Sequence, residues 1–270
     1  MSPLLRDQLH VFLGPDELVI HHVNRRIFGN KVSMSTTPCP EADSNQALWQ
    51  PAIDQLEKTM GLIGNKCELS VVISNAFVRY QLLDAQAELK SYEEESAYVK
   101  FKFNEIYGGI SNHWDFTWGP GLQVSPQVVT AIDQALLLKL KALCVAFHAR
   151  LISVQPSLAR LFNALNKQSK SDGLRFIFIE GRHLCAGLLA KGQWVGLRSA
   201  RFEGVLQDDL SDMIEREFVM TDTSMVNQEL VLCLPQKIDI HSSSSRPVLV
   251  LVARPAGLLV NAISAGIVRK

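Results

Sequence analysis

Near its start the chain reads Leu9-His10-Val11-Phe12-Leu13-Gly14 and then Glu17-Leu18-Val19-Ile20-His21-His22-Val23. Far downstream it reads Arg175-Phe176-Ile177-Phe178-Ile179-Glu180-Gly181, then Leu184-Cys185-Ala186-Gly187-Leu188-Leu189-Ala190 and Trp194-Val195-Gly196-Leu197. In both copies an apolar strand ends in glycine, turns tightly and returns as a second strand. We expect a third strand over residues 27–32 in the first copy and 193–202 in the second. A repeat that occurs only twice, far apart, predicts two similar α/β lobes rather than a solenoid.

Composition excludes several classes of protein. The chain has 270 residues, 47% of them hydrophobic, which suits one large domain or two lobes with proper cores. Lysine plus arginine equals aspartate plus glutamate, at 27 each. The net charge is therefore near zero and does not indicate binding to nucleic acid or to a membrane surface. No apolar run reaches the roughly 18 residues that span a bilayer, and residues 1–7 lack a signal-peptide core. These features predict a cytoplasmic protein.

Neither a metal site nor a catalytic centre is expected. The five cysteines are scattered and mostly sit in apolar segments, which favours buried reduced thiols over disulfides or ligands: Cys39, Cys67, Cys144, Cys185 and Cys233. The sequence has no His-x-x-x-His or Cys-x-x-Cys pattern. A Gly-x-Ser-x-Gly setting and glycine-rich phosphate loops are also missing. We therefore assign no catalytic and no metal-binding residue.

Strands and helices alternate between and after the two copies. The pattern predicts helices over 46–62, Tyr92–Tyr107, 134–150, 157–166 and 206–219, and one more within 257–268; strands over 69–74, 113–118, 128–132, 151–154, 229–233 and Val248–Val252; an extended segment over 75–83; and a turn over 242–245. Ser91 with Glu94 forms a capping box, and Asp133 caps the following helix. Such alternation predicts mixed sheets flanked by helices.

This order of elements resembles the actin-like ATPase fold, which pairs two ribonuclease-H-like lobes around a nucleotide cleft. The resemblance implies a first lobe over residues 1–150 and a shortened second lobe over 151–270.

Several stretches resemble one bacterial branch of that superfamily more specifically. They are residues 71–83, Glu93-Glu94-Glu95-Ser96-Ala97-Tyr98, Phe103-Asn104-Glu105-Ile106-Tyr107-Gly108, His113-Trp114 and Ser153-Val154-Gln155-Pro156-Ser157-Leu158-Ala159. They are similar to the PilM-like and GspL-like cytoplasmic proteins of type IV pilus assembly and type II secretion. The resemblance implies a domain that binds the cytosolic tail of an inner-membrane partner and helps to organise an assembly platform.

The nucleotide motifs that the resemblance implies are degraded. Actin-like proteins end the first strand of each lobe with Asp-x-Gly, whereas this chain has Phe12-Leu13-Gly14 followed by Pro15, which lacks an amide proton. The second lobe has Ile179-Glu180-Gly181, so the acid is shifted by one residue and should point to the other face of its strand. Ala253-Arg254-Pro255-Ala256-Gly257 replaces the expected glycine pair near the adenosine. We therefore expect no ATPase activity and no ATP or magnesium cofactor.

Five residues should nevertheless lie near the cleft if the fold is correct: Gly14, Asp16, Glu180, Gly181 and Arg182. They would form a degenerate cofactor site, or else simply turns with solvated charges.

A partner-binding site is predicted from Asn75, Arg79 and Tyr80, because arginine and tyrosine are favoured interface anchors beside a buried strand. An exposed strand residue with no partner is the alternative for Arg79. Trp114, Phe116 and Trp118 share one face of a strand, where they cover the core of lobe one or form a docking patch.

Together these features predict a non-enzymatic scaffold or adaptor. Two alternatives stay open: an ATP-binding protein whose nucleotide state regulates docking, and a small-molecule kinase of the actin-like superfamily. The missing aspartates disfavour the kinase, because phosphoryl transfer depends on a positioned carboxylate and metal. The sequence leaves open the identity of the partner and whether the chain forms a homodimer.

Overall fold

The computed structural model describes residues 6–26, 29–63, 66–119, 121–168, 173–202, 230–235, 248–252 and 264–268. In chain order the elements are β1 (Asp7–Leu13), β2 (Glu17–Asn24), β3 (Lys31–Pro38), α1 (Gln50–Ile63), β4 (Cys67–Ile73), the short 3-10 helix η2 (Asn75–Phe77), β5 (Val78–Leu83), α2 (Tyr92–Tyr107), η3 (Gly108–His113), β6 (Trp114–Thr117), β7 (Gln127–Asp133), α3 (Gln134–Ala146), β8 (Arg150–Pro156), α4 (Ser157–Gln168), β9 (Gly173–Glu180), β10 (His183–Ala190), β11 (Gln193–Arg201), β12 (Leu230–Leu234), β13 (Val248–Val252) and β14 (Ser264–Val268).

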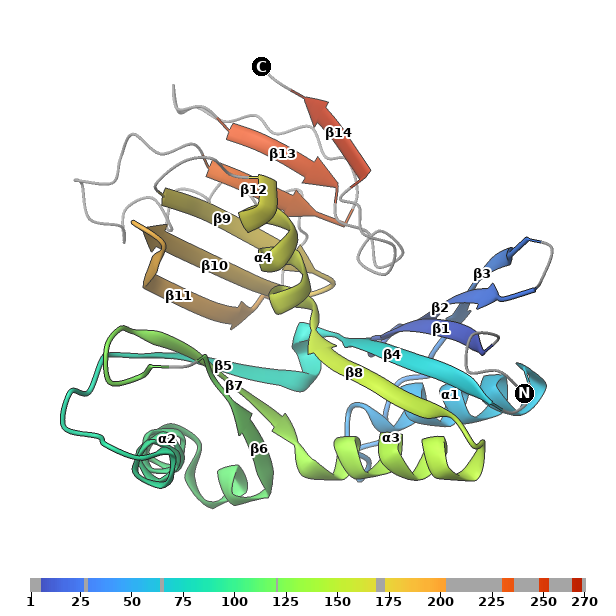
Figure 1. Cartoon of the computed structure of the whole chain (residues 1–270), viewed down its shortest axis with the longest axis horizontal. Helices are drawn as coiled ribbons and strands as arrows, with labels where there is room; N and C mark the ends of the chain where they lie inside the picture. Colours follow the sequence, from blue (N-terminus) through green and yellow to red (C-terminus); the bar gives the residue numbers. More distant parts are fainter. Residues whose placement is uncertain are drawn as a thin grey trace.

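The two larger sheets share one strand order, which confirms the repeat. The first sheet runs β3-β2-β1-β4-β8, and the second runs β11-β10-β9-β12-β13-β14. In each, an antiparallel meander of three strands is continued by two parallel strands on the far side of its first strand. Figure 1 shows the second sheet above the first, and the chain passes from one to the other through β8 and α4. The predicted two-lobed α/β fold is therefore observed.

A third, small sheet of order β5-β7-β6 extends from the first lobe and is covered by α2 (Figure 1). Its core contains Phe103 of α2, against which Phe116 packs with ring centroids 5.0 Å apart. The indole Nε1 of Trp118 donates to the buried carboxylate of Glu95 at 2.8 Å. Trp114, Phe116 and Trp118 thus cover this core, which is the first of the two roles expected for them.

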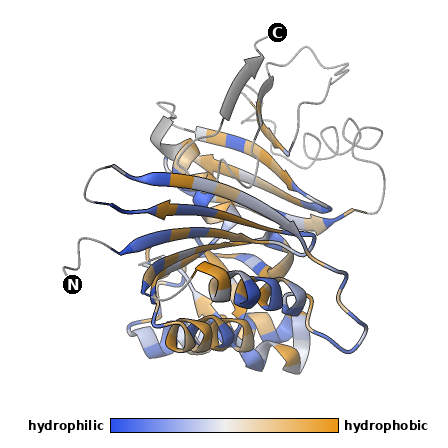
Figure 2. Ribbon diagram, turned by 90° about the vertical axis from the view of Figure 1, so that its right-hand side faces the viewer, coloured by the Kyte–Doolittle hydropathy of each residue, from blue (hydrophilic) through white to orange (hydrophobic). Residues whose placement is uncertain are grey.

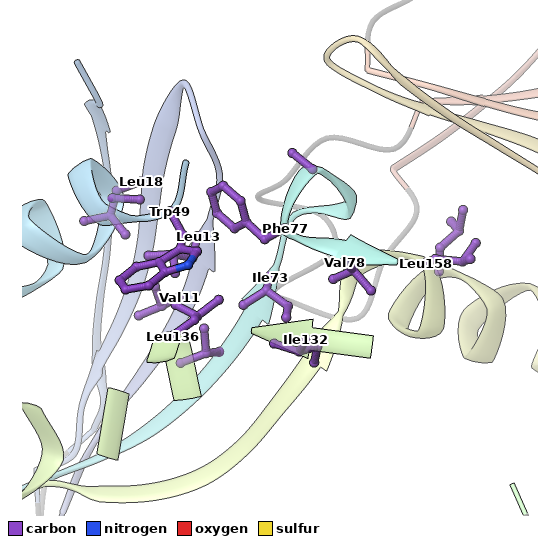
Figure 3. Packing of buried hydrophobic residues seen from close by; sticks show 14 of the residues in the cluster. Val11, Leu13, Leu18, Trp49, Ile73, Phe77, Val78, Ile132, Leu136 and Leu158 are labelled. Carbon is purple, nitrogen blue, oxygen red and sulfur yellow. The ribbon is translucent and has the colours of Figure 1, made fainter. Parts of the chain in front are cut away.

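The main core lies between the first sheet and helices α1 and α3, and it continues through α4 into the second sheet. Leu9, Val11 and Leu13 alternate along β1 and face this core, as a half-buried strand requires. Figure 3 shows Trp49 beside Leu13 and Val11, with Ile73 and Leu136 nearby. Leu158, Leu161 and Leu165 of α4 belong to the same cluster as Phe176 and Phe178 of β9. One continuous apolar core therefore joins the lobes, and Figure 2 shows the hydrophobic residues running along the strands and helices around it.

Several predicted boundaries were wrong. The third strand is β3 over Lys31–Pro38, not residues 27–32, and it takes in part of the segment expected to be a polar link. All eight residues of β3 pair with β2, while almost all of their side chains are exposed. Backbone hydrogen bonds therefore hold the strand in place, and its side chains do not alternate between buried hydrophobic and exposed polar residues. Helix α1 begins at Gln50 rather than at residue 46. Helix α3 ends at Ala146 with Phe147 as its C-cap, and Arg150, predicted as its last residue, belongs to β8.

At the C-terminal end a helix was expected within residues 257–268, but Ser264–Val268 form strand β14 against β13. The helix predicted over 206–219 and the turn over 242–245 lie outside the described residues. Residues 75–83 were expected to be extended, but Asn75–Phe77 form the 3-10 helix η2 and only Val78–Leu83 form strand β5. Helix α2 spans Tyr92–Tyr107 as predicted, and Ser91 caps it. The division at residue 150 stays a prediction, although β8 completes the first sheet through Pro156. Where the structure describes the chain, no helix is long and apolar enough to cross a bilayer.

Candidate functional site in the interlobe cleft

The five predicted cofactor-site residues lie together in one cleft. A cavity of about 630 Å³ opens between the β1–β2 turn and the β9–β10 turn, and Gly14, Asp16, Glu180, Gly181 and Arg182 all line it. We call this cavity the interlobe cleft. The two turns come from equivalent positions in the two copies of the repeat, which explains why they face each other.

The β1–β2 turn is closed by its own backbone. The N–H of Gly14 donates to the carbonyl of Glu17 at 3.0 Å, and Pro15 has no N–H. A Cβ on Gly14 would lie 2.7 Å from the Phe12 ring, so the turn requires glycine there. Phe12 is buried against Val19 and Val72. Neither Gly14 nor Pro15 therefore offers a backbone N–H to a phosphate, and a phenyl ring replaces the expected carboxylate.

The β9–β10 turn faces the acidic side chain of the first turn. Gly181 has a φ of 55°, in the left-handed region that favours glycine. A Cβ on Gly181 would lie 3.7 Å from Oδ2 of Asp16. The neighbouring Glu17 has its pKa raised by burial and by the charge of Asp16. Asp16 and Glu17 thus place two carboxyl groups on this wall of the cleft.

Glu180 hydrogen-bonds across the cleft to lobe one, through contacts that we call the Glu180 junction. Its Oε1 accepts from the hydroxyl of Ser74 at 2.5 Å and from the N–H of Asn75 at 2.8 Å. Ser74 and Asn75 are both buried. Burial raises the pKa of Glu180 above its ordinary value; the neighbouring hydroxyls of Ser157 and Ser74 and the Asn75 N–H lower the pKa, and the charge of Glu17 raises it. The carboxylate therefore ties the end of β9 to the β4–η2 segment.

Two of the three predicted partner-binding residues lie inside the protein. The O–H of Tyr80 donates to Oδ1 of Asn75 at 2.6 Å, and the N–H of Leu158 donates to the same oxygen at 3.2 Å. Asn75 is 1% exposed and Tyr80 is 9% exposed. Burial raises the pKa of Tyr80 well above its ordinary value. Only Arg79 is exposed, and its guanidinium donates to the carbonyl of Val78 at 3.0 Å. The predicted partner site stays a prediction, and Arg79 is its one surface residue.

Sequence reasoning missed four residues near the cleft. Ser74 and Ser157 surround the Glu180 carboxylate, but each is more than 20 positions from it in sequence and no motif joins them. His183 and Arg201 line the cleft as partners in the β10–β11 ladder. Pairing the second and third strands of the second copy in antiparallel register would have placed His183 opposite Arg201.

The described residues hold no metal cluster and no disulfide. No group of three or more His, Cys, Asp or Glu side chains within them is placed to hold a metal ion. All five cysteines are free, and all except the half-buried Cys39 are buried, as the sequence predicted.

No family model matches the chain, and no curated protein matches it by sequence. Solved structures do match. The cytoplasmic domain of EpsL, an inner membrane component of the type II secretion system of Vibrio cholerae, aligns with 9% identity over 96% of this chain and 95% of its own, with a TM-score of 0.58.

Two further structures are similar. A Bacteroides thetaiotaomicron protein with an actin-like ATPase fold and unknown function has 12% identity over 86% of this chain and 82% of its own, with a TM-score of 0.54. The PilM-PilN type IV pilus biogenesis complex has 14% identity over 82% of this chain and 67% of the matched chain, with a TM-score of 0.53. Identities this low establish the fold alone. The chain has the actin-like ATPase fold.

Proposed function

We propose that this protein is a non-enzymatic scaffold or adaptor on the cytoplasmic side of the inner membrane. It would serve an assembly platform of the type IV pilus or type II secretion kind by binding the cytosolic tail of an inner-membrane partner. The fold likeness to the EpsL cytoplasmic domain and to the PilM-PilN complex supports this proposal.

The observation that carries the non-enzymatic part is the Glu180 junction. Phosphoryl transfer needs a positioned carboxylate that holds a metal and its waters. Here the acid of the second lobe accepts hydrogen bonds from Ser74 and Asn75, and the first lobe has Phe12 in place of an acid. The cleft thus joins the lobes through protein groups, and we propose that it uses neither ATP nor magnesium.

A second candidate is an ATP-binding protein whose nucleotide state regulates docking. The size of the interlobe cleft favours it, since about 630 Å³ lies in the usual range for small-molecule sites. The closed β1–β2 turn and the facing carboxylates of Asp16 and Glu17 disfavour it.

Titration with Mg-ATP separates the two candidates. The scaffold predicts no heat in calorimetry and no change in melting temperature at millimolar Mg-ATP. A dissociation constant in the micromolar range with a raised melting temperature would establish the nucleotide-binding reading instead. A second titration would use synthetic cytosolic tails of inner-membrane proteins encoded beside this gene. The scaffold predicts saturable binding of one tail, and failure of every such tail would contradict it.

A further inference from the structure

Four basic side chains gather where the two lobes meet, and three of them, Arg182, His183 and Arg201, line the interlobe cleft. Arg182 and His183 lie at the β9–β10 turn, and Arg201 sits opposite His183 in the β10–β11 ladder. Arg79 comes from β5 of the first lobe, which runs beside β11. Burial and the charges of Arg201 and Arg79 lower the pKa of His183, so the positive charge of this group comes from the three arginines. We call these four residues the cationic cluster.

Within the part of the chain that the structure describes, the arginines of the cationic cluster form no ion pair with a carboxylate. Arg182 and Arg201 are both exposed. Arg79 donates only to carbonyls of its own segment, at Val78 and Ala76. Asp16 acts on His183 from the β1–β2 turn, and the carboxyl groups of Glu17, Glu41 and Glu180 also line the cleft. Arg182 and Arg201 can therefore bind the carboxylates of a ligand on their side of the cavity.

The opposite wall of the cleft decides which kind of anion fits. Asp16, Glu17 and Glu41 line that wall, so a compact polyphosphate would meet like charges there. The N–H of Gly14 is already bonded within the turn and Pro15 has none, so the β1–β2 turn gives phosphate little compensation. An extended peptide can instead direct its carboxylates toward one wall only, because alternate side chains of an extended chain point the same way. Guanidinium groups also match carboxylates in planar, bidentate geometry.

We infer that the cationic cluster docks an acidic, extended segment of a partner protein in the interlobe cleft. The inference rests on the proposed scaffold function and assigns it a surface, with Arg182 and Arg201 as the chief contacts. Arg79 belongs to lobe one and the other three residues to lobe two, so the docked segment would bridge the lobes at the Glu180 junction.

The test uses the full chain and the peptide acetyl-Glu-Ala-Glu-Ala-Glu-amide, with the glutamine analogue of that peptide as the uncharged comparison. Calorimetry at low ionic strength should show saturable binding of the acidic peptide that weakens as salt is added. Arg182→Gln and Arg201→Gln should each weaken binding about two- to fivefold, as exposed ion pairs do. Asp16→Asn should tighten it about two- to threefold, because it removes a carboxylate that repels the acidic peptide. Arg26→Gln is the matched control, an exposed arginine away from the cleft that should change nothing.

The outcomes separate this inference from the proposed function. The docking site would be overturned if the peptide did not bind, or if its affinity did not change in the Arg182 and Arg201 variants. The scaffold proposal would not be affected by this result, because the titrations with Mg-ATP and with cytosolic tails test it separately. Binding of tripolyphosphate in place of the peptide, with the same dependence on arginine, would overturn the docking site and also point to a nucleotide site. Opposite effects of the arginine and Asp16 variants on the acidic peptide alone would support it, since a purely structural role for these residues predicts no tightening.

Discussion

Replacing Glu180 by alanine should loosen the contact between the lobes and destabilise the protein. Alanine removes the acceptor for the Ser74 hydroxyl and the Asn75 N–H, and both donors are buried. Hydrogen bonds to a charged acceptor contribute roughly 1.5–3 kcal/mol each, and a buried donor left unpaired costs about 1–3 kcal/mol. The burial penalty on the charged carboxylate offsets part of this, since burial raises the pKa of Glu180. We expect a net loss of about 2–4 kcal/mol in the free energy of unfolding.

Urea unfolding followed by tryptophan fluorescence measures this loss, with Glu180→Gln as the matched variant. Glutamine keeps one oxygen acceptor and removes the charge, so it should lose less, about 1 kcal/mol. The two variants would contradict the Glu180 junction if both unfolded within about 0.5 kcal/mol of the wild-type protein, the scatter of ordinary surface substitutions.

The same pair of proteins gives a pH dependence with a definite sign. The folded-state pKa of Glu180 is raised above its ordinary value of 4.5, so its contribution to stability is greatest below that value. The contribution falls as pH rises through the folded-state pKa, because the carboxylate must then be buried charged. The stability advantage of wild type over Glu180→Gln should therefore shrink from pH 5 toward pH 8. A constant or growing advantage would show that burial does not dominate at this carboxylate.

Three further predictions follow from individual contacts. Gly187→Ala should cost about 1–3 kcal/mol in urea unfolding, because its Cβ would lie 2.4 Å from the buried ring of Phe176; an unchanged midpoint would contradict this packing. Asp133→Ala should cost about 1–2 kcal/mol, since Asp133 caps α3 and accepts from the Trp49 indole at 2.9 Å; the cap-preserving Asp133→Asn variant should retain most of that stability, and equal losses would argue against the cap. Burial raises the pKa of Cys185 to about 12, so it should resist a thiol reagent in the native protein at pH 8. Mass spectrometry that found Cys185 labelled as fast as half-buried Cys39 would contradict its burial.

The sequence could predict those parts of the fold in which hydrophobic spacing decides the structure. Strands such as β1 and β9 are buried, and their residues match the two copies of the repeat. Strand β3 could not be placed, since its residues are almost all exposed and its position follows from backbone pairing with β2. Strand β14 was also missed, because an apolar C-terminal segment fits a helix or a strand equally well until its pairing with β13 is known.

The sequence indicated which residues lie at the candidate site but not which groups they contact. The five cleft residues follow from the turns of the repeat, so Gly14 and Gly181 could be placed without coordinates. The sequence indicated that the acid of the second lobe is shifted by one residue, yet the partners of Glu180 could not be found from it. Ser74 and Asn75 lie 106 and 105 positions away, and only the packing of the two lobes brings them to the carboxylate.

The central claim is that the lobes are joined by protein groups without a nucleotide, and a distance measurement tests it most directly. Spin labels at Leu62→Cys on α1 and Gln193→Cys on β11, both exposed, would report the separation of the lobes by electron double resonance in a Cys39→Ser background. We predict one narrow distance distribution that Mg-ATP leaves unchanged and that Glu180→Ala broadens. A distribution that is broad without nucleotide and narrows when Mg-ATP is added would contradict the account.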